Sequence, residues 1–208
     1  MSDSIGPSNL YRRRYLMKPK VAIIGKGKVG SAIQRGLERA GYEVHAVGND
    51  PAKVRETASW GELIILAVPF RALDDALEEM GDAVSGKPLV DATNVLTPDY
   101  ELAFGCTTSG AEELQKKAPS GRVVKAFNTI FANLMDSGQV SGTPITLFAA
   151  GDDTEAKELA LSMGRDIGFD TVDAGPLKNA RWLETLGYLN IQLAMLGMGR
   201  NIGFKLIR

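Results

Sequence analysis

Three glycines near the start of the chain have the spacing of a phosphate-binding loop. Gly25, Gly27 and Gly30 follow the apolar run Val21–Ile24 and precede a segment with helical periodicity. In such a loop the first glycine permits a tight turn, the second lets a pyrophosphate approach the backbone, and the third lets helix and strand pack closely. Because the helix start also offers free N–H groups and partial positive charge, the pattern predicts a dinucleotide site rather than a glycine-rich turn without a ligand. The residues predicted to bind the phosphates are Gly25, Lys26, Gly27, Lys28, Val29 and Gly30.

The end of the second predicted strand is where a dinucleotide-binding fold recognises the adenosine ribose. Asn49 and Asp50 occupy this position. The Asp50 carboxylate could accept hydrogen bonds from ribose hydroxyls, which favours NAD. It could equally cap a helix that begins at Pro51, since proline suits the first position of a helix. These residues leave NAD and NADP both open.

Polar and aromatic residues follow other predicted strands. Asn94 follows one strand, and Asn128 and Thr129 follow another. Because ligands of doubly wound folds bind outside the carboxyl ends of the strands, these side chains could orient a carboxamide or a second flat substrate; alternatively, the asparagines close turns. Phe70 and Phe127 could present ring faces to a ligand or belong to the core. The residues predicted to frame the nicotinamide and its redox partner are Val68, Pro69, Phe70, Asn94, Ala126, Asn128 and Thr129.

Short apolar runs alternate with helical segments, and these elements must position the residues above. The predicted strands are Val21–Ile24, Glu43–Val47, Leu63–Val68, Pro88–Asp91, Arg122–Ala126, Ile145–Ala150 and Asp170–Ala174. Such alternation is typical of an α/β fold, here a Rossmann-type, doubly wound parallel sheet. Only fifteen residues separate Val47 from Leu63, which is room for one short helix. One edge strand of the sheet is therefore expected to be missing.

The last part of the chain, Lys178–Met198, is predicted to be helical and apolar on two sides. A helix that is apolar nearly all round is buried. We expect residues 182–204 to form a homodimer interface; the alternative is that the helix packs across its own sheet. The expected organisation is a disordered tail at 1–17, a dinucleotide-binding Rossmann domain at 18–176 and a C-terminal helical dimerisation segment at 177–208.

Composition excludes several other classes of function. The 208 residues carry 24 Lys and Arg against 25 Asp and Glu, and the net charge of −1 gives no general attraction to nucleic acid or anionic membranes. One cysteine and one histidine rule out a disulfide framework and a Cys/His zinc site, and no metal site is predicted. Cys106 is expected to be a bystander thiol, because no histidine is near it. Without a long apolar run or a signal-peptide pattern at its start, the chain is expected in the cytoplasm.

Several segments together match a known family. They are Gly25–Gly30, Ala67–Phe70, Lys125–Thr129 and Asp173–Glu184. With these motifs, residues 18–208 resemble the NADP oxidoreductases that depend on the deazaflavin coenzyme F420, most closely the short dinucleotide-binding members, and the related NADPH-binding domain of metalloreductases. The resemblance implies hydride transfer between NADP, or NAD, and a deazaflavin, flavin or similar carrier. It implies no catalytic acid or base, and the single histidine, His45, lies inside a predicted strand.

Two other functions fit the same fold. A dehydrogenase of hydroxy acids or imines needs a proton donor, commonly a Lys with an Asn one helical turn away. Lys178 is available, but Asn190 lies too far along the chain. A non-catalytic redox sensor would bind the dinucleotide without turnover. Arg181 and Glu184, three residues apart, are expected to pair on a helix surface or, from the resemblance, to anchor the structure under the site.

Overall fold

A seven-stranded sheet forms the centre of the molecule, with its strands in the order β2-β1-β3-β4-β5-β8-β9. The structure is a computed structural model and describes residues 18–105 and 107–208. The predicted tail at 1–17 and the predicted bystander Cys106 lie outside these residues. The strands of the sheet are β1 (Val21–Ile24), β2 (Val44–Val47), β3 (Leu63–Leu66), β4 (Pro88–Asp91), β5 (Arg122–Ala126), β8 (Thr146–Gly151) and β9 (Asp170–Asp173).

The strands from β2 to β5 run parallel, and Val21 in β1 lies opposite both Val44 and Leu63. β1, β3 and β4 are buried along their whole length, as expected for a parallel sheet covered on both faces. β8 differs from the predicted parallel arrangement, because it runs antiparallel to β5. The segment between them holds a 3-10 turn and a hairpin, β6 (Gln139–Val140) and β7 (Thr143–Pro144), and an antiparallel neighbour needs no helical crossover. The Rossmann-type α/β fold is confirmed, with this one reversed pair.

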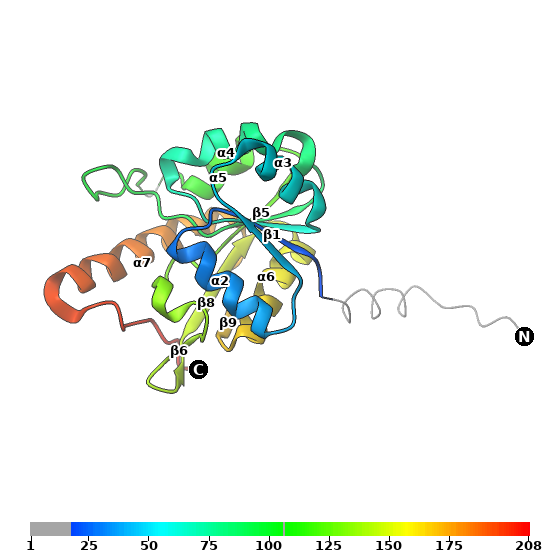
Figure 1. Cartoon of the computed structure of the whole chain (residues 1–208). Helices are drawn as coiled ribbons and strands as arrows, with labels where there is room; N and C mark the ends of the chain where they lie inside the picture. Colours follow the sequence, from blue (N-terminus) through cyan, green and yellow to red (C-terminus); the bar gives the residue numbers. More distant parts are fainter. Residues whose placement is uncertain (1–17, 106) are drawn as a thin grey trace, which may run out of the picture.

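Helices cover both faces of the sheet (Figure 1). α2 (Lys28–Arg39) and α6 (Thr154–Ile167) lie on one face. The opposite face carries α3 (Pro51–Trp60), α4 (Leu73–Met80) and α5 (Gly110–Lys117). Each face has an apolar core of its own, so the sheet is doubly wound.

The sheet ends at β2, because α3 alone connects β2 to β3. The predicted loss of one edge strand is therefore confirmed. On this open edge the ring of His45 stacks on Trp60, with 3.8 Å between the ring centroids. No helix in the part of the chain that the structure describes is both long enough and apolar enough to cross a bilayer.

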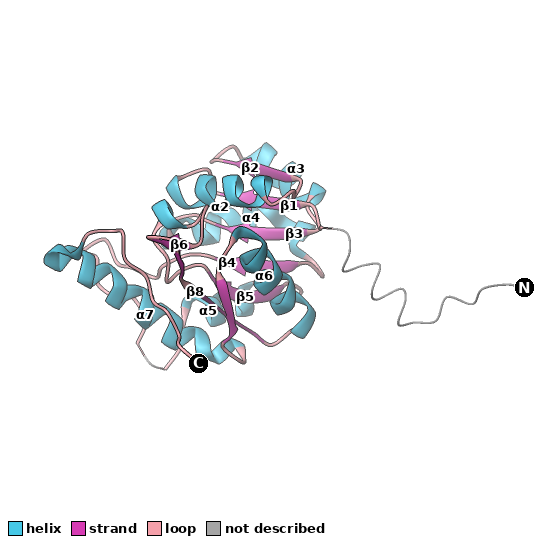
Figure 2. Cartoon of the chain, turned by 90° about the horizontal axis from the view of Figure 1, so that it is seen from below, coloured by secondary structure: helices cyan, strands magenta, loops and turns pink. Residues whose placement is uncertain are grey.

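The C-terminal part forms α7 (Ala180–Leu193), which a π-helical turn at Ala194–Met198 continues. α7 runs outward past the sheet, and the chain then returns toward it (Figures 1 and 2). The returning segment is held by β8, since the N–H of Thr146 donates to the carbonyl oxygen of Phe204 at 2.8 Å. The predicted helix is thus present, and the segment that follows it is anchored to β8.

Candidate functional site

The glycine loop joins β1 to α2, and its three glycines are needed for different reasons. A Cβ on Gly30 would lie 1.8 Å from the carbonyl oxygen of Gly25, so only glycine lets the helix pack on the loop. Gly25 has a φ of +112°, and its Cβ would lie 2.4 Å from the carbonyl oxygen of Ala67, just after β3. A Cβ on Gly27, by contrast, would meet nothing within 4 Å. Gly27 therefore leaves open space at the start of α2, where the helix has free backbone N–H groups.

The end of β2 lies beside this loop, because the N–H of Gly25 donates to the carbonyl oxygen of Val47 at 2.9 Å. Asp50 caps α3 here. Its carboxylate accepts from the N–H of Lys53 at 3.4 Å and lies 3.5 Å from the Lys53 ammonium. Pro51, the first residue of α3, has no N–H to offer. The geometry thus shows that Asp50 caps the start of α3. Asn49 precedes it in the same loop.

The end of β3 brings Val68, Pro69 and Phe70 to the same edge of the sheet. Pro69 is exposed. The ring of Phe70 meets Phe104 edge-on, with 5.6 Å between centroids, and lines a hollow against α4 and α5. Phe127, after β5, is fully buried against Phe169 and therefore belongs to the core.

Asn94 and Asn128 contact each other across the ends of β4 and β5. The amide of Asn94 donates to the backbone oxygen of Asn128 at 3.1 Å. Asn128 Nδ2 donates to the carbonyl oxygen of Leu183 at 2.8 Å, and because a carbonyl only accepts, this bond fixes the orientation of the Asn128 amide. Asn128 Oδ1 is left buried, without a hydrogen-bond partner among the described residues. Such an acceptor is costly to bury, and an N–H donor on a bound ligand would remove that cost.

α7 lies directly over these strand ends. A Cβ on Gly187 would lie 2.8 Å from Asn128 Nδ2 and 2.8 Å from Asn94 Oδ1, so only glycine permits this approach. One turn further on, Asn190 donates to the backbone oxygen of Thr129 at 3.0 Å. Ala126, the last residue of β5, is fully buried beside them. The helix therefore forms one wall of the space outside β4 and β5.

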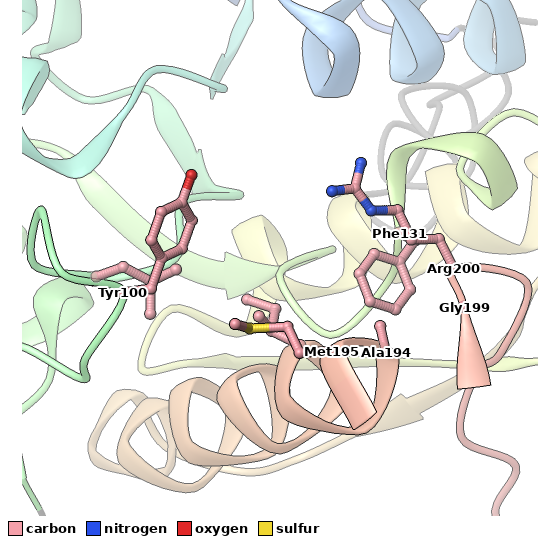
Figure 3. Close-up of a pocket in the computed structure, with 8 residues that line it drawn as sticks. Tyr100, Phe131, Ala194, Met195, Gly199 and Arg200 are labelled. Carbon is pink, nitrogen blue, oxygen red and sulfur yellow. The ribbon is translucent and has the colours of Figure 1, made fainter. Parts of the chain in front are cut away.

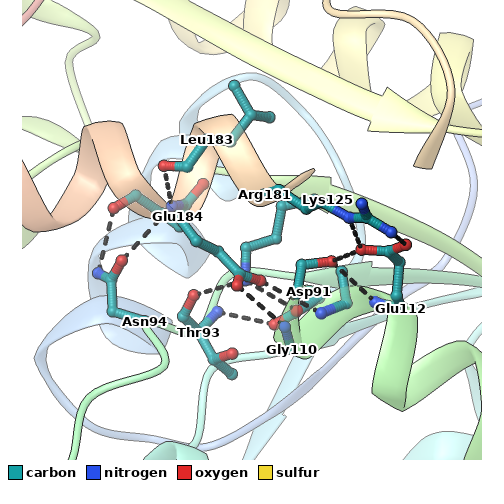
Figure 4. Close-up of polar contacts among 12 residues, drawn as sticks. Asp91, Thr93, Asn94, Gly110, Glu112, Lys125, Arg181, Leu183 and Glu184 are labelled. Atoms are coloured by element: carbon teal, nitrogen blue, oxygen red, sulfur yellow. Dashed lines mark hydrogen bonds and ion pairs between the residues drawn. The ribbon is translucent and has the colours of Figure 1, made fainter. Parts of the chain in front are cut away.

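A buried charge cluster fixes this helix to the sheet (Figure 4). Lys125 Nζ lies 2.9 Å from Asp91 Oδ2 and 3.0 Å from Glu184 Oε1, and no member is more than 3% exposed. Lys125 also donates to the carbonyl oxygen of Thr93 at 2.8 Å. Glu184 accepts from two N–H groups at the start of α5, at 2.9 and 3.2 Å, where the helix end supplies partial positive charge. The cluster thus links β4, β5, α5 and α7.

The cluster keeps the ammonium group of Lys125 charged. Burial by itself would lower the pKa of Lys125, but the charges of Asp91 and Glu184 outweigh burial and hold this pKa above its ordinary value. Since the folded-state pKa is raised, the stability that Lys125 contributes is complete at neutral pH and is lost only as the pH rises through that value.

Arg181 and Glu184 do not form the predicted surface pair with each other. Arg181 instead binds Glu112 on α5, with Nη2 at 2.7 Å from Oε1. Hydrogen bonds from Arg181 hold the pKa of Glu112 below its ordinary value although the side chain is partly buried. Glu112 also belongs to a capping interaction, since its N–H donates to Ser109 Oγ at 3.1 Å. Both α7 charges thus anchor the helix.

Two cavities open beside the site. The α7 cavity has a volume of about 530 Å³, and Figure 3 shows Tyr100 and Arg200 on opposite sides of it, with Ala194 and Met195 at its base. Its lining residues are Leu96, Tyr100, Phe131, Ile191, Ala194, Met195, Gly199 and Arg200. The α2 cavity, of about 520 Å³, lies between the glycine loop and the 3-10 turn η3 (Ala132–Leu134). Its lining residues are Lys26, Gly27, Lys28, Ser31, Arg35, Ala132 and Asn133.

The residues present fit a dinucleotide. Gly27 leaves room above free N–H groups, and Lys26 and Lys28 place two cations at the same helix start. The unpartnered Asn128 Oδ1 suits the N–H of a carboxamide. Val29, in the first turn of α2, is half-buried and packs against the apolar core.

Several residues of the site were not among the sequence predictions. Ser31 and Arg35 lie three and seven residues after Lys28, and that helical spacing could have revealed them. The apolar lining of the α7 cavity comes from three separate segments, around Leu96, Phe131 and Met195. The charge cluster joins residues far apart in the sequence, and no local pattern indicates it.

Known sequences are similar to this chain. A profile of the family described as NADP oxidoreductase, coenzyme F420-dependent, matches residues 20–95. The F420-dependent NADP reductase of Methanothermobacter marburgensis is 32% identical over 197 residues, which cover 86% of this chain and 82% of that protein. Metalloreductase STEAP3 of Rattus norvegicus is 32% identical over 181 residues, 81% of this chain but 36% of that protein. The chain thus spans about a third of the length of this metalloreductase.

Solved structures share the fold. A crystal structure from Arthrobacter sp. FB24, assigned by its description to the F420-dependent NADP reductases, superposes with a TM-score of 0.84 at 28% identity, over 91% of this chain and 100% of that chain. An imine reductase from Myxococcus stipitatus, solved with NADP+, gives a TM-score of 0.65 at 18% identity, over 86% of this chain and 63% of its own. At that identity the second likeness concerns the fold alone.

Proposed function

The chain belongs to the family of coenzyme F420-dependent NADP oxidoreductases, and we propose that it transfers a hydride between NADP(H) and a deazaflavin, flavin or similar flat carrier. One observation carries the proposal. Phe131 lines the α7 cavity, and the next two residues, Ala132 and Asn133, line the α2 cavity beside the glycine loop. A phosphate-binding loop and an apolar cavity therefore lie on two sides of one short segment.

The described residues can position a bound dinucleotide. Gly27 and the start of α2 hold the pyrophosphate, while Lys26 and Lys28 neutralise it. Asn94 and Asn128 orient the carboxamide, Asn128 through its free Oδ1. When bound, the dinucleotide supplies the reactive hydride of its nicotinamide ring. Hydride transfer from NADPH to such a carrier, which also takes up one proton from solvent, needs positioning of the two rings rather than an acid or base on the protein.

The α7 cavity is the site we assign to the second carrier. Its volume of about 530 Å³ lies within the range of small-molecule sites. Leu96, Phe131, Ile191 and Met195 offer apolar surface to a flat ring, and Arg200 adds one cation at the side.

The residues expected beside the adenosine ribose, at the end of β2, are compatible with binding of both NADP and NAD. Family membership favours NADP. However, Asp50 and Pro51 leave few free N–H groups at the start of α3 for a 2′-phosphate, since Asp50 takes the N–H of Lys53 and proline has none. We therefore expect NADPH and NADH both to bind, with Asn49 and Asp50 beside the ribose.

The first test is anaerobic mixing of the pure chain and NADPH with a deazaflavin and, separately, with FMN. We expect the absorbance of reduced nicotinamide to fall as the carrier is reduced, in a ratio of one to one. A chain that binds NADPH but reduces neither carrier would refute the proposed reaction and favour a redox sensor.

We further propose that α7 and the segment after it, within 182–204, form a homodimer, which makes residues 177–208 a dimerisation segment beside a Rossmann domain at 18–176. One side of α7 packs on its own strand ends, as Gly187 shows. On the opposite side, Trp182 and Leu189 lie seven residues apart on one face of α7 and are exposed by 57 and 48%. Leu196, in the π-helical turn that follows, is 81% exposed. Exposed apolar stripes of this kind mark interaction sites.

Leu189→Glu is expected to convert a dimer into a monomer, because it places a charge in the middle of that stripe. Light scattering of the full chain measures the mass. Ile207→Glu, at a position that is 89% exposed but outside the stripe, is the matched control and should leave the dimer intact. A monomeric mass for the unsubstituted chain would reject the dimer.

A further inference from the structure

The chain turns back sharply after α7, and the turn brings Arg200 to the α7 cavity (Figure 3). Gly197 and Gly199 have φ values of +102° and +71°, which residues with a side chain rarely adopt. A Cβ at either glycine would meet nothing within 4 Å, so the backbone conformation rather than a lack of space requires glycine. Further along, the carbonyl oxygen of Phe204 accepts from the N–H of Thr146. Arg200 therefore lies between a glycine turn and a segment that is bonded to β8.

Arg200 is the one charged residue among those that line the α7 cavity. Within residues 18–105 and 107–208, its guanidinium forms no ion pair and no hydrogen bond. Tyr100 lies on the opposite side of the cavity, and the carboxylate that follows it, Glu101, accepts from the Tyr188 hydroxyl at 2.8 Å instead. The cavity therefore offers a ligand one uncompensated positive charge beside an apolar surface.

Uptake of a hydride changes the charge of an acceptor ring. A hydride carries one proton and two electrons, so a neutral ring that receives it becomes an anion, while NADPH becomes NADP+. One C–H bond of the nicotinamide breaks, and a new bond to hydrogen forms on the acceptor ring. The ring stays anionic until a proton arrives from solvent. A fixed cation beside it therefore stabilises the reduced ring, and the transition state in which its charge develops, more than it stabilises the neutral oxidised ring.

We propose that Arg200 stabilises the negative charge that develops on the acceptor ring during hydride transfer. The inference rests on the proposed function and on the assignment of the ring to the α7 cavity. It narrows the acceptor to flat rings that delocalise the charge of an added hydride. A guanidinium suits this role, because it is planar, keeps its charge at any working pH and offers several N–H donors to ring oxygen and nitrogen atoms. Arg200 is thus a specificity-determining residue of the acceptor site.

The test compares the oxidised and reduced forms of two rings that carry no anionic group outside the ring, riboflavin and deazariboflavin. Binding to the full chain is measured by anaerobic calorimetry in mildly alkaline buffer, where the reduced rings are anions. Tetrahydro-NADP, which neither donates nor accepts a hydride, fills the dinucleotide site. The unsubstituted chain should bind the reduced form more tightly. Arg200→Gln should weaken binding of the reduced form by about three- to tenfold, as expected for loss of one charge-assisted contact near solvent, and leave the oxidised form unchanged.

Two further variants separate the charge of Arg200 from its shape and from the net charge of the chain. Arg200→Lys keeps the charge, so it should retain most of the preference for the reduced form. Arg208→Gln removes an exposed guanidinium that pairs with Asp170 outside the cavity, and should leave the preference unchanged. In turnover from NADPH to riboflavin, Arg200→Gln should lower kcat and leave the KM for riboflavin unchanged, because the oxidised ring is neutral.

Three results would overturn the proposal: equal binding of the oxidised and reduced forms to the unsubstituted chain, an equal loss of both forms in Arg200→Gln, or no binding of either ring. An equal loss of both forms would mean that Arg200 only contacts the ring. The failure of the proposed function is a different result. In that case the preference for the reduced ring and its loss in Arg200→Gln persist, but no hydride passes from NADPH to any carrier.

Discussion

Gly27→Asp should abolish tight binding of NADPH without destabilising the protein. Gly27 is the N-cap of α2, with an extended backbone and no side-chain cap, and a Cβ there meets nothing within 4 Å. Aspartate is a favoured N-cap residue, so the free energy of unfolding should stay the same or rise by about a few tenths of a kcal/mol. The new carboxylate, however, stands where the phosphates must approach. Repulsion of a few kcal/mol between such close charges corresponds to a loss of about 100-fold or more in affinity.

Two further variants separate the effect of the added charge from the effect of the added side-chain volume. Gly27→Ser supplies a cap without a charge, so it should keep stability and lose less affinity. Gly30→Ala places a Cβ 1.8 Å from the carbonyl oxygen of Gly25, so it should lower both the melting temperature and the affinity. Titration with NADPH and thermal unfolding measure the two effects. An unchanged Kd for Gly27→Asp would mean that the loop is only a turn.

Lys125→Met is expected to destabilise the fold more than any change on the surface. The substitution leaves two carboxylates, Asp91 and Glu184, buried next to each other without their cation. Breaking a buried ion pair in this way costs about 3–5 kcal/mol. For a chain of this size, that should lower the melting temperature by roughly 6–20 °C. NADPH binding should also weaken, because the same cluster fixes α7 against Asn128.

Neutral replacements of the carboxylates provide the control for this change. Lys125→Met combined with Asp91→Asn and Glu184→Gln removes the uncompensated charge and should recover part of the loss. Lys205→Met breaks a pair with Asp170 that is partly exposed, and should cost at most about 1 kcal/mol. Equal melting temperatures for Lys125→Met and Lys205→Met would contradict the role of the cluster.

Local patterns were sufficient to predict the parts of the fold that depend on local physics. The glycine loop, the strand before it and the helix after it are adjacent in sequence. Gly30 approaches the backbone of Gly25 within the loop, Gly25 approaches the end of the neighbouring strand β3, and Gly27 leaves open space. The missing edge strand follows from chain length alone, because fifteen residues between Val47 and Leu63 hold only α3. The reversed direction of β8 could not be derived this way, since its apolar pattern is the same in either direction.

The charge cluster shows why the rest of the site could not be predicted from the sequence. Lys125 and Asp91 are 34 residues apart, and Glu184 lies 74 residues from the α5 N–H group that it accepts from. In sequence, Lys125 is a charge inside a predicted strand, and Arg181 and Glu184 have the spacing of a surface pair. Only the packing of α7 over the strand ends decides that Glu184 turns inward to Lys125 while Arg181 reaches Glu112.

A calorimetric titration of the pure chain with NADPH and with NADH shows whether the glycine loop binds a dinucleotide. We predict saturable binding of one dinucleotide per chain, with the affinity lost in Gly27→Asp. Absence of binding to both dinucleotides would contradict a dinucleotide site at this loop, because Gly25, Gly27 and Gly30 would then form a turn and nothing more.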